Sequence, residues 1–98
     1  LRPGLAMLVK QLADEVGPAG GRAFGVLPGS IGTDRMTYLL GQAPDPAAAK
    51  AATEAGIPLR RMGDPAEFGR VAAFLLSDAA SYVTGCLVPV DGGAMRAL

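Results

Sequence analysis

The stretch from Val26 to Arg35 constrains this chain most, because a short apolar segment ends there in a loop rich in glycine. Residues 24–27 are apolar and bounded by glycines, a pattern typical of a strand buried on both faces in a parallel sheet. Pro28 then removes a backbone donor, while Gly29 and Gly32 permit positive φ and close approach of a ligand to the main chain. The sequence therefore predicts a binding loop at the carboxyl end of a buried strand.

The polar groups of this loop suit a carboxamide or a phosphate. Ser30 and Thr33 add hydroxyls beside backbone N–H groups that we expect to be free. A Pro-Gly pair after a strand is more often only a turn, and for the pair alone that interpretation stays open.

The rest of the chain has the patterns of alternating helices and strands. Asp64-Pro65-Ala66-Glu67 combines a capping residue, a proline at the first helical position and an acid at the third, which predicts a helix start. Apolar periodicity and composition predict the other elements. In order, we expect a helix over 5–16, a strand over 24–27, short helices over 36–41 and 46–55, a helix over 65–76 and a strand over 86–90.

This order predicts an α/β fold. A right-handed crossover between the two strands would make them parallel. Two strands are too few for a stable open sheet, which generally needs at least three strands or cover on both faces. We therefore interpret residues 1–98 as a single partial domain.

Two strings of the chain resemble signatures of one enzyme family. Residues 28–33, Pro-Gly-Ser-Ile-Gly-Thr, resemble the Pro-Gly-x-Ile-x-Thr loop of the short-chain dehydrogenase/reductase family, which binds the nicotinamide end of the cofactor. Residues 77–85, followed by Val-Asp-Gly-Gly at 90–93, resemble the C-terminal signature of the same family. The chain is similar to the C-terminal segment of classical, 3-oxoacyl-carrier-protein-reductase-like members. The resemblance implies the C-terminal part of a Rossmann-like, doubly wound parallel sheet.

The resemblance also implies site residues and a cofactor, NAD or NADP. Pro28, Gly29, Ile31 and Thr33 would contact this cofactor. Residues 36–56 would form a helical flap on the substrate side. Tyr38 would line the substrate pocket, although an aromatic residue on a short helix more often serves packing.

The catalytic pair of the family is represented only in part. Its Tyr-x-x-x-Lys motif places Arg2 at the lysine position, and the tyrosine would stand four residues earlier, ahead of residue 1. Arg2 could donate to ribose hydroxyls, but a planar guanidinium differs from a compact ammonium group. The alternative is that Arg2 only solvates a helix terminus. We expect the isolated chain to be inactive.

The function implied is hydride transfer between nicotinamide and the carbonyl/alcohol pair of a small-molecule substrate. The alternative is a catalytically silent packing or oligomerisation module of the same fold. Hydrophobic residues make up 50% of the chain, which is more than so small a core can bury. This excess indicates apolar surfaces that another chain or segment covers. We expect a homo-oligomer formed through residues 65–76 and 86–90, as in many family members.

Composition disfavours several other functions. Nine basic and nine acidic residues balance, with no basic stripe, which argues against a nucleic-acid partner. The apolar runs are shorter than the roughly 20 residues of a membrane span. No signal peptide is visible and Cys86 is the single cysteine, so we expect a cytoplasmic protein. The lack of histidine disfavours a zinc site or a histidine-based triad, and we expect no metal.

Overall fold

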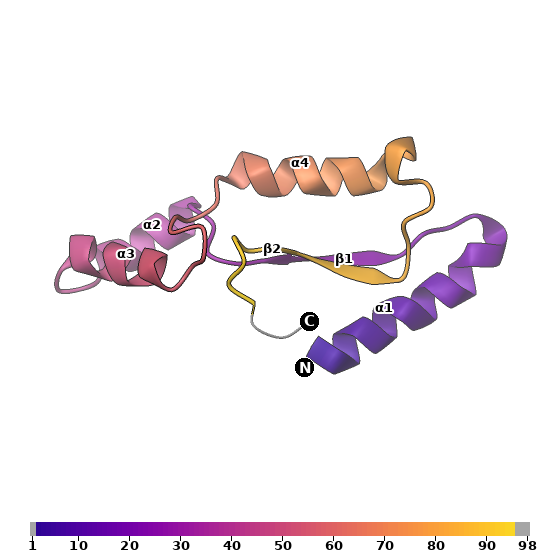
Figure 1. Cartoon of the computed structure of the whole chain (residues 1–98), viewed down its shortest axis with the longest axis horizontal. Coiled ribbons are helices and arrows are strands. Elements are labelled where there is room, and N and C mark those ends of the chain that lie inside the picture. The colour runs from indigo at the N-terminus through magenta and orange to yellow at the C-terminus, as the bar shows by residue number, and fades with distance from the viewer. Residues whose placement is uncertain (1, 96–98) are drawn as a thin grey trace. The chain divides into compact units, whose positions relative to one another are not determined.

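The computed structural model describes residues 2–95, and side chains from residue 4 onward. The predicted helices and strands are all present in the predicted order, and α1, α2 and β1 are slightly longer than expected (Figure 1). The elements are α1 (Arg2–Val16), η1 (Gly17–Ala19), β1 (Phe24–Pro28), α2 (Asp34–Gly41), α3 (Pro46–Ala55), α4 (Pro65–Leu76), η2 (Asp78–Ala80) and β2 (Cys86–Val90).

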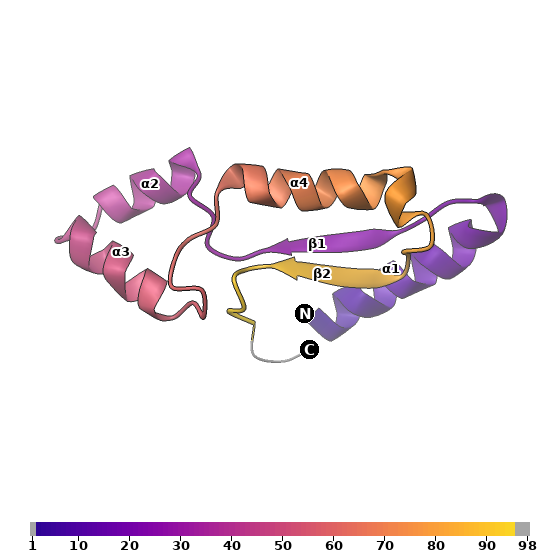
Figure 2. The same cartoon turned by 45° about the horizontal axis from the view of Figure 1, so that its top comes forward.

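β1 and β2 form a two-stranded parallel sheet. At one end of the sheet the Gly85 amide donates to the Ala23 carbonyl at 2.7 Å, and at the other the Gly29 amide donates to the Val90 carbonyl at 3.1 Å. Both strands therefore advance in the same direction, as the arrows in Figure 2 show. The predicted α/β fold class is confirmed.

The chain divides into two compact units, and residues 2–27 with 72–88 form the first. In this unit α1 covers one face of the strands and the last turn of α4 the other (Figure 1). Gly25 permits close packing, because a Cβ atom there would lie 2.6 Å from Leu87 Cδ2. The most buried apolar side chains of the unit belong to Val9, Ala13, Leu75 and Ala80. Helices on both faces of a parallel sheet are the arrangement expected of an α/β fold.

Arg22 holds the end of α4 in this unit. Its Nη1 atom donates to the carbonyl oxygens of Leu75 at 2.7 Å and Ala80 at 3.1 Å, and more weakly to that of Val83 at 3.3 Å. The last carbonyls of a helix lack donors within the helix, so the guanidinium satisfies groups that would otherwise need water. The sequence analysis did not predict this role for Arg22.

The second unit contains residues 28–71 with 89–95. It holds the loop after β1, the helix pair α2 and α3, which lie side by side in Figures 1 and 2, and the first turns of α4. Ile57, 4% exposed, is its most buried side chain among the described residues. Gly92, with φ 63°, lies against it, since a Cβ atom on Gly92 would be 2.8 Å from Ile57 Cγ2.

Carboxylates form two caps in the second unit, of which the one that starts α4 was predicted. The Asp64 carboxylate accepts from the Ala66 amide and Glu67 accepts from the Asp64 amide, each at 2.9 Å, so a capping box starts α4. The Asp91 carboxylate accepts from the amides of Gly93 and Met95, both at 2.9 Å. This second cap fixes the turn that follows β2.

Apolar side chains of α4 remain uncovered in the single chain. Leu75 is 3% exposed, whereas Phe74 is 51% and Leu76 is 72% exposed. The exposure of Phe74 and Leu76 is compatible with the expected homo-oligomer contact through residues 65–76, which stays a prediction.

Candidate functional site

The loop after β1 is anchored by its own backbone. The Gly29 amide donates to Val90, the Gly32 amide donates to the Gly63 carbonyl at 2.8 Å, and the Thr33 amide donates to the Ile31 carbonyl at 2.7 Å. These three amides are therefore not free for a ligand. We expect the free amides between Gly29 and Gly32. Within residues 2–95, the amides of Ser30 and Ile31 have no acceptor.

Gly63 pairs with the loop like a short strand. Ile31 and Gly63 form a parallel bridge, in which the Gly63 amide also donates to the Ser30 carbonyl at 2.9 Å. A Cβ atom on Gly63 would lie 2.9 Å from Ile31 Cδ1, so a larger residue would displace the loop. Two long-range hydrogen bonds between Gly63 and the loop thus fix the loop after β1.

The loop glycines are needed for space rather than for positive φ. Neither Gly29 nor Gly32 adopts the positive φ that glycine permits. A Cβ atom on Gly29 would lie 2.6 Å from Asp91 Cβ, which is closer than real Cβ contacts come. The neighbour that requires a glycine here is therefore Asp91 of the same chain, and close approach of a ligand stays a prediction.

Thr33 begins α2. Its Oγ1 atom accepts from the Met36 amide at 3.2 Å, and its carbonyl accepts from the Thr37 amide at 2.9 Å. The backbone of Thr33 is extended, with φ −81° and ψ 166°, as expected of an N-cap residue. Because the cap uses Oγ1 as an acceptor, the hydroxyl proton is left to donate to a ligand.

A cavity of about 400 Å³, here the loop cavity, lies at this loop. Its lining is mostly apolar and includes all four residues predicted to contact the cofactor. The lining residues are Pro28, Gly29, Ile31, Thr33, Arg35, Met36, Leu39, Pro65 and Phe68. The structure thus brings the predicted cofactor residues together on one concave surface with the start of α4.

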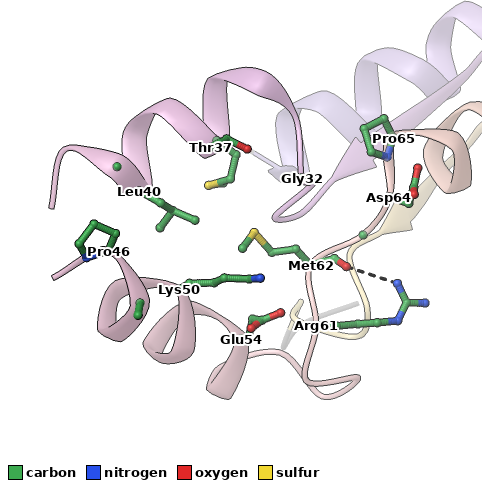
Figure 3. Close-up of a pocket in the computed structure, with 14 residues that line it drawn as sticks. Gly32, Thr37, Leu40, Pro46, Lys50, Glu54, Arg61, Met62, Asp64 and Pro65 are labelled. Atoms are coloured by element: carbon green, nitrogen blue, oxygen red, sulfur yellow. Dashed lines mark hydrogen bonds between the residues drawn. The ribbon is translucent and has the colours of Figure 1, made fainter.

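A second cavity of about 730 Å³, here the flap cavity, lies between the helix pair and the segment that precedes α4 (Figure 3). It shares Met36 and Pro65 with the loop cavity. The other lining residues are Gly32, Thr37, Leu40, Gly41, Pro46, Ala47, Lys50, Glu54, Arg61, Met62, Gly63 and Asp64. The resemblance implies a flap on the substrate side, but the sequence assigns none of these residues to a substrate.

The roles of two candidate residues stay predictions. Tyr38 is 65% exposed and is not among the residues that line either cavity, so its contact with substrate stays a prediction. Arg2 falls in the first turn of α1, but its side chain lies outside the described part of the chain. Its catalytic role stays a prediction as well.

An ion pair borders the flap cavity. Arg61 Nη1 and Nη2 donate to the Glu67 carboxylate at 2.7 and 2.9 Å, a bidentate arrangement. The hydrogen bond from Arg61, aided by that from the Asp64 amide, lowers the pKa of Glu67 from 4.5 to about 2. The same hydrogen bond raises the pKa of Arg61. The capping pattern predicts only that the Glu67 side chain accepts from a backbone amide at the start of α4.

Two structural features are absent from the part of the chain described here. Residues 2–95 contain no group of three or more His, Cys, Asp or Glu side chains able to hold a metal ion. None of the helices in this range is long and apolar enough to cross a membrane.

Sequence comparisons find relatives, several of which are named as reductases or dehydrogenases. A family model described as Enoyl-(Acyl carrier protein) reductase matches residues 2–95. Protein FixR of Bradyrhizobium diazoefficiens is 46% identical, with coverage of 94% of this chain and 30% of the relative. The 3-oxoacyl-[acyl-carrier-protein] reductase FabG of Pseudomonas aeruginosa is 41% identical, with coverage of 94% and 35%. The Inactive 2-(S)-hydroxypropyl-CoM dehydrogenase 2 of Xanthobacter autotrophicus is 42% identical, with coverage of 88% and 37%.

Solved structures also match this chain. A short chain dehydrogenase family protein of Francisella tularensis matches with a TM-score of 0.85 at 31% identity, over 94% of this chain and 40% of that protein. YwfH, an NADPH dependent reductase involved in Bacilysin biosynthesis, matches with a TM-score of 0.87 at 31% identity, over 98% and 38%. The chain spans about a third of the length of these curated relatives. It belongs to the short-chain dehydrogenase/reductase family and corresponds to a part of its members.

Proposed function

We propose that this chain forms the part of an NAD(P)-dependent oxidoreductase that faces the nicotinamide and the substrate. The reaction would move a hydride between nicotinamide and the carbonyl/alcohol pair of a small molecule. The observation that supports this most is the loop cavity, whose lining includes Pro28, Gly29, Ile31 and Thr33 together. Membership of the family supports the same class of reaction.

The lining of the loop cavity fits a nicotinamide group. A nicotinamide has an apolar ring and a carboxamide, and the side chains of Met36, Leu39 and Phe68 offer apolar surface for the ring. The Ile31 amide has no acceptor within residues 2–95, and the Thr33 hydroxyl proton is spared by its cap. These two donors would hold the carboxamide oxygen. When bound, the nicotinamide supplies or accepts the hydride.

The anchoring of the loop would serve orientation. Hydrogen bonds from Gly29 to Val90 and from Gly32 to Gly63 fix the loop on both sides of Ile31. A donor whose backbone is already fixed loses little freedom when it binds, and a fixed carboxamide sets which face of the ring meets the substrate. The hydrogen bonds within the chain thus favour a single orientation of the ring.

Proton transfer would depend on a group that these residues lack. The resemblance puts the acid/base tyrosine four positions before Arg2, beyond the 98 residues. We propose that Arg2 contacts ribose hydroxyls and that the chain by itself binds without catalysing turnover. The single cysteine, Cys86, fits a reducing cytoplasm as the place where the protein acts.

The second candidate function is a silent packing or oligomerisation module. A relative named as an inactive dehydrogenase is 42% identical to this chain, and Phe74 and Leu76 are exposed on α4. Such a module needs α4 and β2 but no cofactor, so binding of nicotinamide separates the two functions.

The test is a nuclear magnetic resonance titration of the chain with nicotinamide mononucleotide, combined with a turnover assay. The oxidoreductase proposal predicts shifts of the Ile31 and Thr33 amides and no oxidation of NADH or NADPH with a ketone. Loop resonances that stay unchanged at saturating ligand would favour the silent module instead.

A further inference from the structure

Two opposite charges face the flap cavity without a partner. Lys50 and Glu54 lie one turn apart on α3 and both line the cavity. Figure 3 shows their side chains extending from α3 toward the segment that carries Met62. Within residues 2–95, neither side chain makes a hydrogen bond or an ion pair.

The same spacing gives a different result elsewhere in the chain. Lys10 and Asp14 on α1, also four residues apart, form an ion pair on an exposed surface. A Lys at i and an acid at i+4 can therefore pair in this protein, as is usual for helices. Lys50 and Glu54 instead line the cavity without pairing with each other.

The other charges of the cavity already have partners. Arg61 is held by the Glu67 carboxylate, and Asp64 accepts from the Ala66 amide. Lys50 and Glu54 are thus the charged groups that remain for a ligand, one of each sign. The lining has two positive side chains, Lys50 and Arg61, and two negative ones, Glu54 and Asp64, so it favours neither a simple anion nor a simple cation.

The rest of the lining is apolar and adaptable. Met36, Leu40 and Met62 contribute flexible or branched hydrocarbon, and Pro46 and Ala47 add small apolar surface. A volume of about 730 Å³ is in the range of small-molecule sites. The cavity can therefore hold an extended apolar body beside the two charges.

We propose that the flap cavity selects substrates that have an apolar body and a neutral head group able both to accept and to donate hydrogen bonds, of which a carboxamide is the simplest. Lys50 Nζ donates to the carbonyl oxygen of this head group, and the Glu54 carboxylate accepts from its N–H. This inference rests on the proposed oxidoreductase function. Met36 and Pro65, which line both cavities, place the reacting end of the substrate toward the nicotinamide.

The test compares three probes of equal chain length, hexanamide, hexanoate and hexylammonium, by nuclear magnetic resonance titration of the chain. We expect hexanamide to shift the amides of Thr37, Lys50 and Met62, and to bind about three- to tenfold more tightly than either charged probe. Equal affinities for the three probes, or no shifts at these amides, would overturn the proposal.

Two variants test the roles of the two charges. Lys50→Met leaves Glu54 alone and should turn the preference toward hexylammonium, whereas Glu54→Gln leaves Lys50 alone and should turn it toward hexanoate. Both positions are on α3, where Met and Gln are good helix formers, and circular dichroism checks the fold. Lys10→Met, outside the cavity, is the matched control and should leave the preference for hexanamide unchanged. Unchanged preferences in both cavity variants would contradict the assigned roles.

Nicotinamide mononucleotide, added to the same samples, separates this inference from the function on which it rests. Shifts at Ile31 and Thr33 without a preference for hexanamide would refute the head-group inference alone. A preference for hexanamide without shifts at the loop would refute the oxidoreductase proposal and leave a selective cavity of another function.

Discussion

Gly29 and Asp91 approach so closely that a Cβ atom on Gly29 would lie 2.6 Å from the Cβ and 2.8 Å from the Cα of Asp91. The Gly29 amide also donates to Val90, the residue before Asp91. The Asp91 carboxylate in turn accepts from two amides of the turn that follows β2. The start of the loop after β1 and the end of β2 are therefore locked together at a position where only glycine leaves room.

Gly29→Ala should destabilise the fold, because the added methyl group must displace the backbone beside it. Overpacking of this kind costs about 1–3 kcal/mol in the free energy of unfolding. Gly69→Ala is the control, since a Cβ atom on Gly69 in α4 would meet nothing within 4 Å. An alanine in that helix should stabilise by roughly 0.5–1 kcal/mol. Urea unfolding measures both, and a Gly29→Ala variant as stable as the parent would contradict the close approach.

Thr33→Ala should lower both stability and cofactor affinity. Loss of the cap on the Met36 amide costs about 1 kcal/mol of stability. Loss of the hydroxyl proton as a donor should weaken nicotinamide binding roughly three- to tenfold.

Asp45→Ala is the matched control for Thr33→Ala, because Asp45 caps α3 through the Ala48 amide and lies outside both cavities. It should lose similar stability and keep full affinity. Titration with nicotinamide mononucleotide measures the affinity of both variants. Equal affinity in the two would show that the Thr33 hydroxyl does not contact the ligand.

The pair of Glu67 with Arg61 should make stability depend on acid pH. Because the pKa of Glu67 falls from 4.5 to about 2 in the folded chain, its contribution is present above pH 4.5 and is lost as the pH falls toward 2. Glu67→Gln should therefore flatten the fall of the melting temperature between these two values. Parallel melting curves of the variant and the parent across this range would contradict the role of the pair. Both side chains are largely exposed, so we expect a small effect.

Phe74→Glu should prevent self-association through residues 65–76 and 86–90. Phe74 is 51% exposed on α4, and a charge there would be costly to bury in an interface between copies. Tyr82→Glu is the control, because Tyr82 is fully exposed and outside both segments. In sedimentation velocity the parent and Tyr82→Glu should be heavier than Phe74→Glu. A parent that stays monomeric at high concentration would refute this interface.

The order and type of the helices and strands could be predicted because each depends on local patterns. Asp64 and Glu67 identify the start of α4 by their spacing alone, and the structure has both hydrogen bonds. Glycines near residue 29 likewise indicated close approach, although positive φ occurs instead at Gly92 and Gly93 in the turn after β2.

Contacts between distant parts of the chain could not be predicted in the same way. Arg22 contacts carbonyls more than 50 residues away, and its own neighbours in sequence contain no signal for this. The bridge of Gly63 to Ile31 and the flap cavity likewise depend on the segment before α4 lying beside the loop and the helix pair. Spacing identifies the residues of a loop, but the donors that stay free are known only once the long-range hydrogen bonds are known.

The measurement that tests the central claim most directly compares the two halves of the cofactor, nicotinamide mononucleotide and adenosine monophosphate, in separate titrations of the chain. Both ligands have a ribose and a phosphate, so they differ in the base. The account predicts that nicotinamide mononucleotide shifts the amides of residues 29–33 and that adenosine monophosphate leaves them unchanged. Equal shifts with both ligands, or none with either, would contradict a nicotinamide site at this loop.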